Sequence, residues 1–262
     1  MTSSREINEN KIKKIIKKFF SLIGYKITKI NNFNDRYFDF IAESSEEENK
    51  DLKNAKKLAL ASESNLWSII QSLKYISKNK IDGDIVECGV FKGGSLALIT
   101  KYSKKLSLKS KIIGFDTFED GFTNIKLTEH DINIKGQKLK FSNDGLVKEF
   151  YPTIDIVKKN IKDFLKTNIE NVVLIKGDVH KTLNDFRNIP EKISFLRLDT
   201  DLYSTTKLQL EILFPKLVSG GVLHIDDYGF FPGVRKAVDD YFKSSNIWLH
   251  RVDLTCRLLI KE

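Results

Sequence analysis

Residues 193–228 read ISFLRLDTDLYSTTKLQLEILFPKLVSGGVLHIDDY, and this stretch decides the fold class. An apolar run that ends in Asp-Thr-Asp at 199–201 predicts a buried strand. Apolar residues then recur at helical spacing up to Pro215, and a second apolar run ends in Asp226 and Asp227. A strand, a helix and a strand in this order predict two parallel strands joined by a crossover helix.

The same alternation extends in both directions, from Asp84 to the C-terminus. The remaining predicted strands cover 84–90, 111–118, 171–178, 247–254 and 256–262, and the remaining helices cover 93–105, 153–165, 180–186 and 232–242. The last two strands leave no room for a helix between them, so they should include an antiparallel pair. The sequence therefore predicts an α/β fold: a doubly wound, mostly parallel seven-stranded sheet with an N-terminal helical extension.

Composition limits the class of protein. The chain has 262 residues, of which 41% are hydrophobic, which suits one large domain with a modest extension. The net charge of +9 favours acidic partners in general, but aromatic-studded basic motifs are missing, so we expect no nucleic-acid partner. Two cysteines, a polar N-terminus and the lack of a long apolar run indicate a cytoplasmic protein without a signal peptide or transmembrane helix.

The segments before the first strand differ from the rest of the chain. Residues 11–23, KIKKIIKKFFSLI, predict a basic amphipathic helix that docks on this domain or a partner subunit, or that contacts a membrane surface. Residues 43–54 are polar and acidic, which indicates a linker or mobile lid, and 56–78 predict a further amphipathic helix. The predicted parts are the N-terminal helix and linker at 1–55, the main domain at 56–262, and an insert at about 119–150 that serves as a lid.

Ligands of open α/β sheets bind beyond the carboxyl ends of the strands, so the residues there are candidates for the site. The first such segment is ECGVFKGGS (87–95), in which Gly89 permits a tight turn and Gly93 permits close approach of a ligand. Alone, this segment predicts a structural turn equally well. Asp116 after the second strand would accept hydrogen bonds from ribose hydroxyls, and Asp178 would face an adenine amino group. Together they favour a nucleoside cofactor.

Four aspartates at two neighbouring strand ends are the sharper signal. Asp199, Asp201, Asp226 and Asp227 would repel one another unless a cation were present. Their hard oxygen ligands suit Mg²⁺, Mn²⁺ or Ca²⁺. The alternative is that Asp201 or Ser204 caps the following helix while Asp226 is a turn residue.

At these residues the chain resembles the macrocin O-methyltransferase (TylF-like) family of class I methyltransferases. The resemblance covers about 82–242, and its most specific motifs are LDTDLYST and GG-x-x-x-IDDY. It implies S-adenosylmethionine as cofactor, Mg²⁺ (or Mn²⁺) held by Asp199, Asp226 and Asp227, and Asp201 as the general base. Family members commonly form homo-oligomers. The predicted contacts with the cofactor are Glu87, Gly89, Val90, Gly93, Ser95, Asp116, Thr117 and Asp178.

The predicted function is transfer of a methyl group from S-adenosylmethionine to a hydroxyl of a sugar, a glycosylated small molecule or a glycan. One alternative is a non-sugar acceptor, such as a phenolic or lipid-linked molecule. Another is a SAM-binding scaffold without catalytic activity, which the four intact aspartates argue against. Residues 1–55 carry no motif of the family, although they and the 119–150 insert should form the wall around the acceptor.

Overall fold

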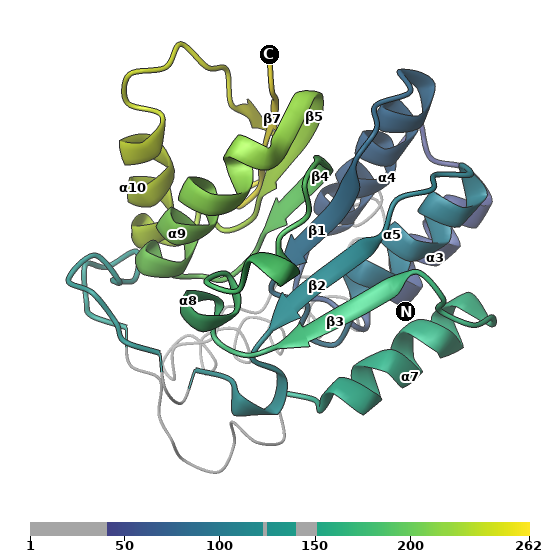
Figure 1. The fold of residues 1–262 in the computed structure, drawn as a ribbon, viewed down its shortest axis with the longest axis horizontal. Helices are drawn as coiled ribbons and strands as arrows, with labels where there is room; N and C mark the ends of the chain where they lie inside the picture. The colour runs from purple at the N-terminus through teal and green to yellow at the C-terminus, as the bar shows by residue number, and fades with distance from the viewer. Residues whose placement is uncertain (1–40, 123–124, 140–150) are drawn as a thin grey trace, which may run out of the picture. The chain divides into compact units, whose positions relative to one another are not determined.

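A computed structural model describes residues 41–122, 125–139 and 151–262 of the chain. They form a seven-stranded sheet in the order β3-β2-β1-β4-β5-β7-β6 (Figure 1). The first five strands run parallel, while β7 is antiparallel to both β5 and β6. This arrangement confirms the predicted α/β fold and its antiparallel C-terminal pair. The strands are β1 (Asp84–Cys88), β2 (Ile112–Asp116), β3 (Val172–Lys176), β4 (Ile193–Leu198), β5 (Leu217–Ile225), β6 (His250–Arg251) and β7 (Arg257–Ile260).

Helices lie on both faces of this sheet. Helices α8, α9 and α10 cover the near face, and α4 and α5 lie behind it (Figure 1). The described helices are α3 (Glu46–Lys56), α4 (Glu63–Lys78), α5 (Gly94–Lys105), α7 (Ile154–Leu165), α8 (Val179–Thr182), α9 (Tyr203–Leu213) and α10 (Pro232–Tyr241). Within the described part of the chain, none of these helices is long and apolar enough to span a bilayer.

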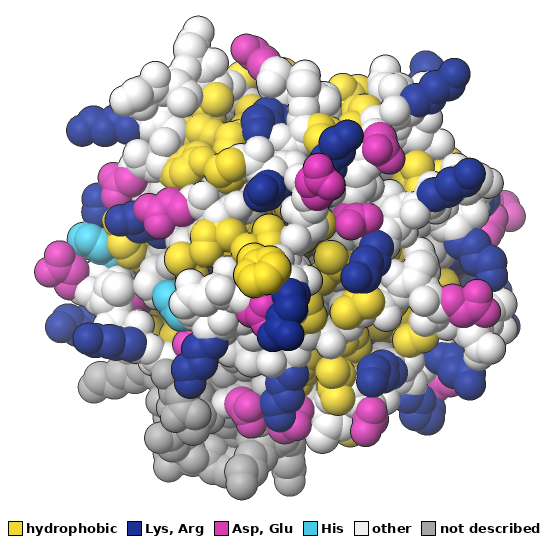
Figure 2. Space-filling model, viewed as in Figure 1, with side chains coloured by type: hydrophobic (Ala, Val, Ile, Leu, Met, Phe, Trp, Pro, Cys, Tyr) yellow, Lys and Arg dark blue, Asp and Glu magenta, His cyan; other side chains and the backbone are white. Residues whose placement is uncertain are grey.

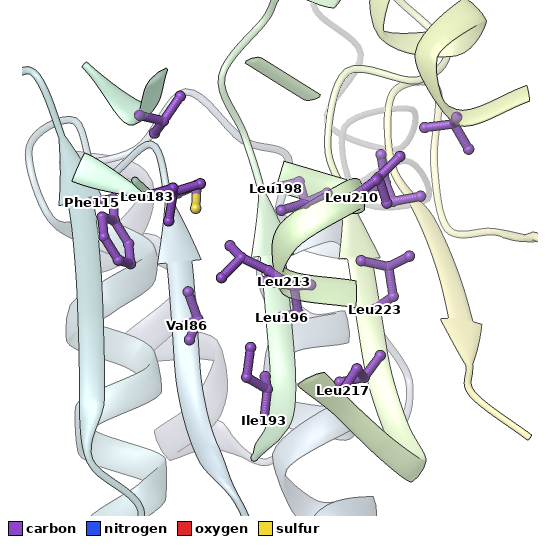
Figure 3. Packing of buried hydrophobic residues seen from close by; sticks show 14 of the residues in the cluster. Val86, Phe115, Leu183, Ile193, Leu196, Leu198, Leu210, Leu213, Leu217 and Leu223 are labelled. Atoms are coloured by element: carbon purple, nitrogen blue, oxygen red, sulfur yellow. The ribbon is translucent and has the colours of Figure 1, made fainter. Parts of the chain in front are cut away.

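The core on the near face joins the central strands to the crossover helix. Val86, Leu196 and Leu223 project from β1, β4 and β5 towards Leu210 and Leu213 of α9 (Figure 3). All five side chains are fully buried, and each contributes about 1.5–3 kcal/mol relative to an exposed side chain. This packing holds the ends of β4 and β5 side by side.

Charged side chains are dispersed over the surface of the near face. Figure 2 shows Lys and Arg interspersed with Asp and Glu, so the net positive charge does not gather into a single patch there.

The structure corrects the prediction that 43–54 form a linker or lid, because this segment lies mostly within helix α3. Ser45 and Glu48 form a reciprocal capping box at its start. Leu52 is fully buried, and Asp51 pairs with Lys101 of α5 at 2.6 Å. The acidic composition therefore reflects a first helical turn that complements the helix dipole and a set of ion pairs with neighbouring helices.

Two further element boundaries differ from the prediction. The helix expected over 56–78 begins only at Glu63, because Ser62 accepts a hydrogen bond from the Asn65 amide and caps α4 there. Strand β6 has only two residues, whereas the sequence predicted 247–254. The predicted basic helix at 11–23 lies outside the described residues.

Candidate active site

A cavity of about 460 Å³ lies at the carboxyl ends of the parallel strands. Its lining includes every predicted site residue except Glu87 and Gly93. Residues far apart in the sequence, from β1 to the segment before β7, therefore meet at one place, as the topology predicts.

Asp116 organises the loop that follows β1. Its Oδ2 accepts hydrogen bonds from the backbone amides of Val90 at 2.6 Å and Phe91 at 2.8 Å, and its Oδ1 accepts one from Phe118 at 2.6 Å. Burial raises the pKa of Asp116, and the three amides act in the opposite direction. The carboxylate therefore has a fixed orientation at the cavity wall, where Thr117 also lies.

The two predicted glycines of this loop have different surroundings. A Cβ at Gly89 would lie 1.7 Å from the carbonyl oxygen of Asp199, and its φ is +90°. Only glycine therefore lets the end of β1 approach the acid cluster so closely. A Cβ at Gly93 would instead lie 3.2 Å from Val157 and Ile161 of α7. Gly93 thus serves the packing of α7 rather than the cavity.

Asp178 and Ser95 complete the half of the cavity formed by β1, β2 and β3. Asp178 caps α8, and its Oδ1 accepts a hydrogen bond from the amide of His180 and lies 2.8 Å from that residue's ring Nδ1. Ser95 lies in the first turn of α5, is almost fully buried, and lines the cavity. Both residues are thus held in place by the fold.

The aspartate cluster forms the other half. Ligand oxygens of Asp199, Asp226 and Asp227 lie within 4.8 Å of one another. Burial raises the pKa of Asp199 to about 7, and burial together with the Asp201 carboxylate raises that of Asp227 well above its usual range. Close, desolvated carboxylates of this kind fit a hard divalent cation, because a cation would relieve both the repulsion and the desolvation.

Asp201 and Asp227 both adopt left-handed backbone conformations, with φ of 62° and 60°. Such conformations cost about 1–3 kcal/mol for residues other than glycine and persist only where the surroundings impose them. Both residues line the same cavity, and burial raises the pKa of each carboxyl group. Helix α9 begins after Leu202, which offers no side-chain cap, so the alternative role of Asp201 or Ser204 as its cap is wrong.

Arg197 lies at the centre of the acid cluster, and the sequence interpretation did not include it. Its guanidinium is 1% exposed and donates hydrogen bonds to Glu87 at 3.0 Å, Asp199 at 2.6 Å and Asp226 at 2.7 Å. The protein itself thus supplies one of the cations that the acid cluster requires. A charged residue inside the apolar run of β4 was the available signal, since an arginine in a buried strand needs acidic partners.

Glu87 contributes to the site from beneath the cavity. It is fully buried, and burial raises its pKa to about 7 even though the Arg197 guanidinium lowers it. Its Oε1 accepts a hydrogen bond from Arg197, so it shares this guanidinium with Asp199 and Asp226, and its contact with the cofactor stays a prediction.

Asp226 is the most constrained of the aspartates. Its carboxylate accepts hydrogen bonds from Asn65 of α4 at 3.0 Å and from the Thr255 hydroxyl at 2.9 Å, in addition to Arg197. Asn65 and Thr255 lie outside the strand ends on which the sequence interpretation concentrated. The cluster is thus anchored from both sheet neighbours and from the helix behind the sheet.

Aromatic side chains form the remaining wall. Phe230 and Phe231 come three and four residues after Asp227, with ring centroids 4.9 Å apart, and Phe230 is 43% exposed. Phe122 lies near the start of the predicted insert and Tyr151 directly after its end, and their rings lie edge to face with centroids 5.9 Å apart. The cavity therefore combines an acidic floor with an apolar, aromatic wall.

This fold, with a ligand cavity at its strand ends, defines an α/β protein of the methyltransferase class. Its fold is similar to that of the O-methyltransferase NovP, with a TM-score of 0.64 and 22% identity over 78% of this chain and 82% of NovP. A calicheamicin methyltransferase matches with a TM-score of 0.56 and 19% identity, over 84% of this chain and 94% of that one. At such identities the likeness shows the fold alone.

The sequence comparison identifies the family. The model of the macrocin-O-methyltransferase (TylF) family matches residues 16–260, and the chain belongs to this family. It is 27% identical to the demethyldecarbamoylnovobiocin O-methyltransferase of Streptomyces niveus over 67% of this chain and 64% of the relative. It is 25% identical to the mycinamicin III 3''-O-methyltransferase of Micromonospora griseorubida over 63% of this chain and 62% of that relative. The match thus spans less than two thirds of either relative, and it confirms the family resemblance of the motifs.

Proposed function

We propose that this chain transfers a methyl group from S-adenosylmethionine to a sugar hydroxyl, assisted by a divalent cation. The observation that carries the proposal is the triad Asp199, Asp226 and Asp227, whose ligand oxygens lie within 4.8 Å of one another in the wall of the same cavity as Asp116 and Asp178. Cofactor and cation would therefore meet at the reacting hydroxyl. Membership of the TylF family supports this assignment.

The half of the cavity at β1 to β3 has the groups that a nucleoside cofactor requires. S-adenosylmethionine supplies a methyl group that is already activated by its sulfonium. Asp116, oriented by three backbone amides, would accept hydrogen bonds from the ribose hydroxyls. Asp178 would accept a hydrogen bond from the adenine amino group, and Gly89 leaves room for the ligand beside the strand end. The residues present therefore fit this cofactor.

The half at β4 and β5 has the groups that deprotonate and orient an acceptor. When bound, Mg²⁺ or Mn²⁺ would lower the pKa of the attacking hydroxyl. Asp199 and Asp227 have fewer hydrogen bonds than Asp226 and would be the more open ligands. Asp201 lies beside Asp227 and would accept the proton of the hydroxyl as general base. Arg197 would keep Asp199 and Asp226 in a binding geometry.

The proposed acceptor is a sugar carried by a small molecule. The names of two relatives specify methylation of a demethyldecarbamoylnovobiocin and of the 3'' position of mycinamicin III. A related structure is that of a TDP-rhamnose 3'-O-methyltransferase. Phe230 and Phe231 next to the acid cluster favour an acceptor with an apolar face, because the C–H faces of sugars and flat aglycones pack on aromatic rings.

The test is incubation of the full chain with S-adenosylmethionine, Mg²⁺ and a panel of glycosylated small molecules and nucleotide sugars, followed by mass spectrometry. We expect one added methyl group on at least one acceptor, and loss of this activity after EDTA treatment. Undiminished activity in a sample shown by elemental analysis to be metal-free would refute the metal. Tight S-adenosylmethionine binding without transfer to any hydroxyl would favour the scaffold alternative.

A further inference from the structure

Helix α9 receives its N-terminal cap from a distant segment of the chain. Its own N-cap residue, Leu202, has an apolar side chain that accepts no hydrogen bond. The amide of Tyr203, the first helical residue, instead donates to Oδ1 of Asp131 at 2.7 Å. Asp131 lies in the insert, 72 positions earlier in the sequence. It thus supplies the anionic acceptor that helix N-termini prefer.

Asp131 is held firmly in this role. Asp131 is only 1% exposed. Its Oδ2 accepts hydrogen bonds from the amide and the hydroxyl of Thr128 at 2.6 and 2.7 Å. The ring of His130 packs edge to face on Tyr203 with centroids 4.5 Å apart. The described part of the insert around 128–131 is therefore docked on the start of α9 by both polar and aromatic contacts.

Helix α10 leaves space for the same docking. A Cβ at Gly233 would lie 2.9 Å from the carbonyl oxygen of His130 and 3.1 Å from Oδ1 of Asp131. Those distances are tighter than ordinary van der Waals contacts, so a glycine is required where the insert passes α10. The Tyr203 hydroxyl also donates to Asp240 of α10 at 3.2 Å. The insert, α9 and α10 thus meet at one junction.

We propose that Asp131 is a positioning residue that fixes Asp201 and couples it to the docking of the insert. Asp201 lies two residues before Tyr203 and has a left-handed φ of 62°, a conformation that its surroundings must impose. Capping of the Tyr203 amide fixes the end of this turn. The inference rests on the proposed function only in taking Asp201 as the proton acceptor.

The insert also contributes to the cavity in which Asp201 lies. Phe122 and Ile125 line the aromatic wall a few residues before Asp131. One segment therefore carries part of the wall for the acceptor and the cap that holds the base. Displacement of the insert would disturb both, whereas Asp116 and Asp178 at the other half of the cavity would keep their own hydrogen bonds.

The experiment compares Asp131→Ala with Asp131→Asn and with Glu129→Ala, an exposed neighbour in the same segment. In Asp131→Ala we expect exchange of the Tyr203 amide with deuterium to accelerate about 3- to 30-fold, the range that loss of a cap produces. We also expect kcat to fall about 10-fold or more while the Kd for S-adenosylmethionine stays within about 2-fold. Asp131→Asn keeps an acceptor oxygen for the Tyr203 amide but turns its NH2 group towards the Thr128 amide, so it should restore only part of both properties. Glu129→Ala should behave like the unmodified chain.

The two measurements separate this inference from the proposed function. Faster exchange at Tyr203 with an unchanged kcat would overturn the positioning role, and so would unchanged exchange. A chain without methyl transfer to any acceptor would refute the proposed function, while the exchange data would still decide whether Asp131 caps α9. If Asp131→Ala does not fold, Thr128→Val serves as the second variant, because it removes one hydrogen bond from Asp131. It should also lower kcat. A folded Thr128→Val variant with unchanged kcat and unchanged exchange at Tyr203 would then overturn the inference.

Discussion

The two halves of the cavity differ in how their carboxylates are balanced. At the ends of β1 to β3, Asp116 accepts hydrogen bonds from three backbone amides, and Asp178 caps helix α8. Backbone N–H groups of the chain itself thus supply hydrogen bonds to each of these carboxylates. At the ends of β4 and β5, Asp199, Asp201 and Asp227 lie close together, and neighbouring carboxylates add to the effect of burial in raising the pKa of each. Burial raises the pKa of Asp116 as well, but there the backbone amides oppose it. Dipoles of the backbone stabilise the first half, whereas the second half is short of positive charge.

This difference indicates which ligand each half requires. Acceptors that backbone amides hold in a fixed orientation suit the hydroxyl and amino groups of a nucleoside. Arg197 offsets part of the negative charge in the other half, but its single positive charge is shared among Glu87, Asp199 and Asp226. The remaining repulsion among the aspartates of this half is what a divalent cation would relieve.

The largest effect should come from removing the internal cation. Arg197→Met leaves the buried carboxylates of Glu87 and Asp226, and the partly exposed carboxylate of Asp199, without this partner, and we expect a loss of about 3–5 kcal/mol in the free energy of unfolding. Urea denaturation followed by circular dichroism would measure this loss. Arg187→Met is the matched control, because Arg187 also pairs with an aspartate at 2.6 Å but is exposed. Equal stability of the two variants would show that the Arg197 network does not stabilise the fold.

The next effect concerns the proposed base. Asp201→Asn keeps the shape of the side chain but lowers its basicity, and we expect kcat to fall about 100- to 10,000-fold. Isothermal titration should give an unchanged Kd for S-adenosylmethionine. The matched variant in the other half, Asp116→Asn, should weaken cofactor binding instead, because it turns one acceptor into a donor facing backbone amides or the ribose. Near-normal turnover in Asp201→Asn would remove this residue from the base role.

The sequence predicts those parts of the structure that depend on local pattern. Strand–helix alternation gives the sheet, and the carboxyl ends of its strands give the location of Asp116, Asp178 and the four-aspartate cluster. The acidic segment at 43–54 was misinterpreted because charge composition alone does not distinguish a linker from a capped helix with ion pairs. The decisive feature there is the buried Leu52, which needs a partner surface that the sequence does not display.

Most of the site contacts that could not be predicted from the sequence join residues that are far apart along the chain. Asn65 binds Asp226 across 161 positions and Asp131 caps α9 across 72, and neither pair has a local motif. Arg197 was visible as a charge in an apolar strand, but its partners become evident only once β1, β4 and β5 are adjacent. Local spacing thus predicts which acids converge, and tertiary structure determines how their charge is compensated.

The smallest predicted effect is a pH-dependent stabilisation by Mg²⁺ or Mn²⁺. Burial raises the pKa of Asp199 and of Glu87 to about 7 in the folded chain, above their ordinary values near 4. Without a cation, the folded state therefore keeps protons that the unfolded state has released, and stability falls as pH rises from about 4 to 7. A cation replaces those protons and binds better as they leave. The thermal shift that it produces should therefore be larger at pH 8 than at pH 6.

At a free cation concentration of 100 times Kd, the stabilisation should approach about 2.7 kcal/mol. Asp227→Asn removes a proposed ligand and should abolish the shift, whereas Asp185→Asn alters only an exposed ion pair and should leave it intact. A shift of equal size at both pH values, or one that survives in Asp227→Asn, would mean that the cation binds elsewhere. The half of the cavity at β4 and β5 would then be balanced by protons and Arg197 alone.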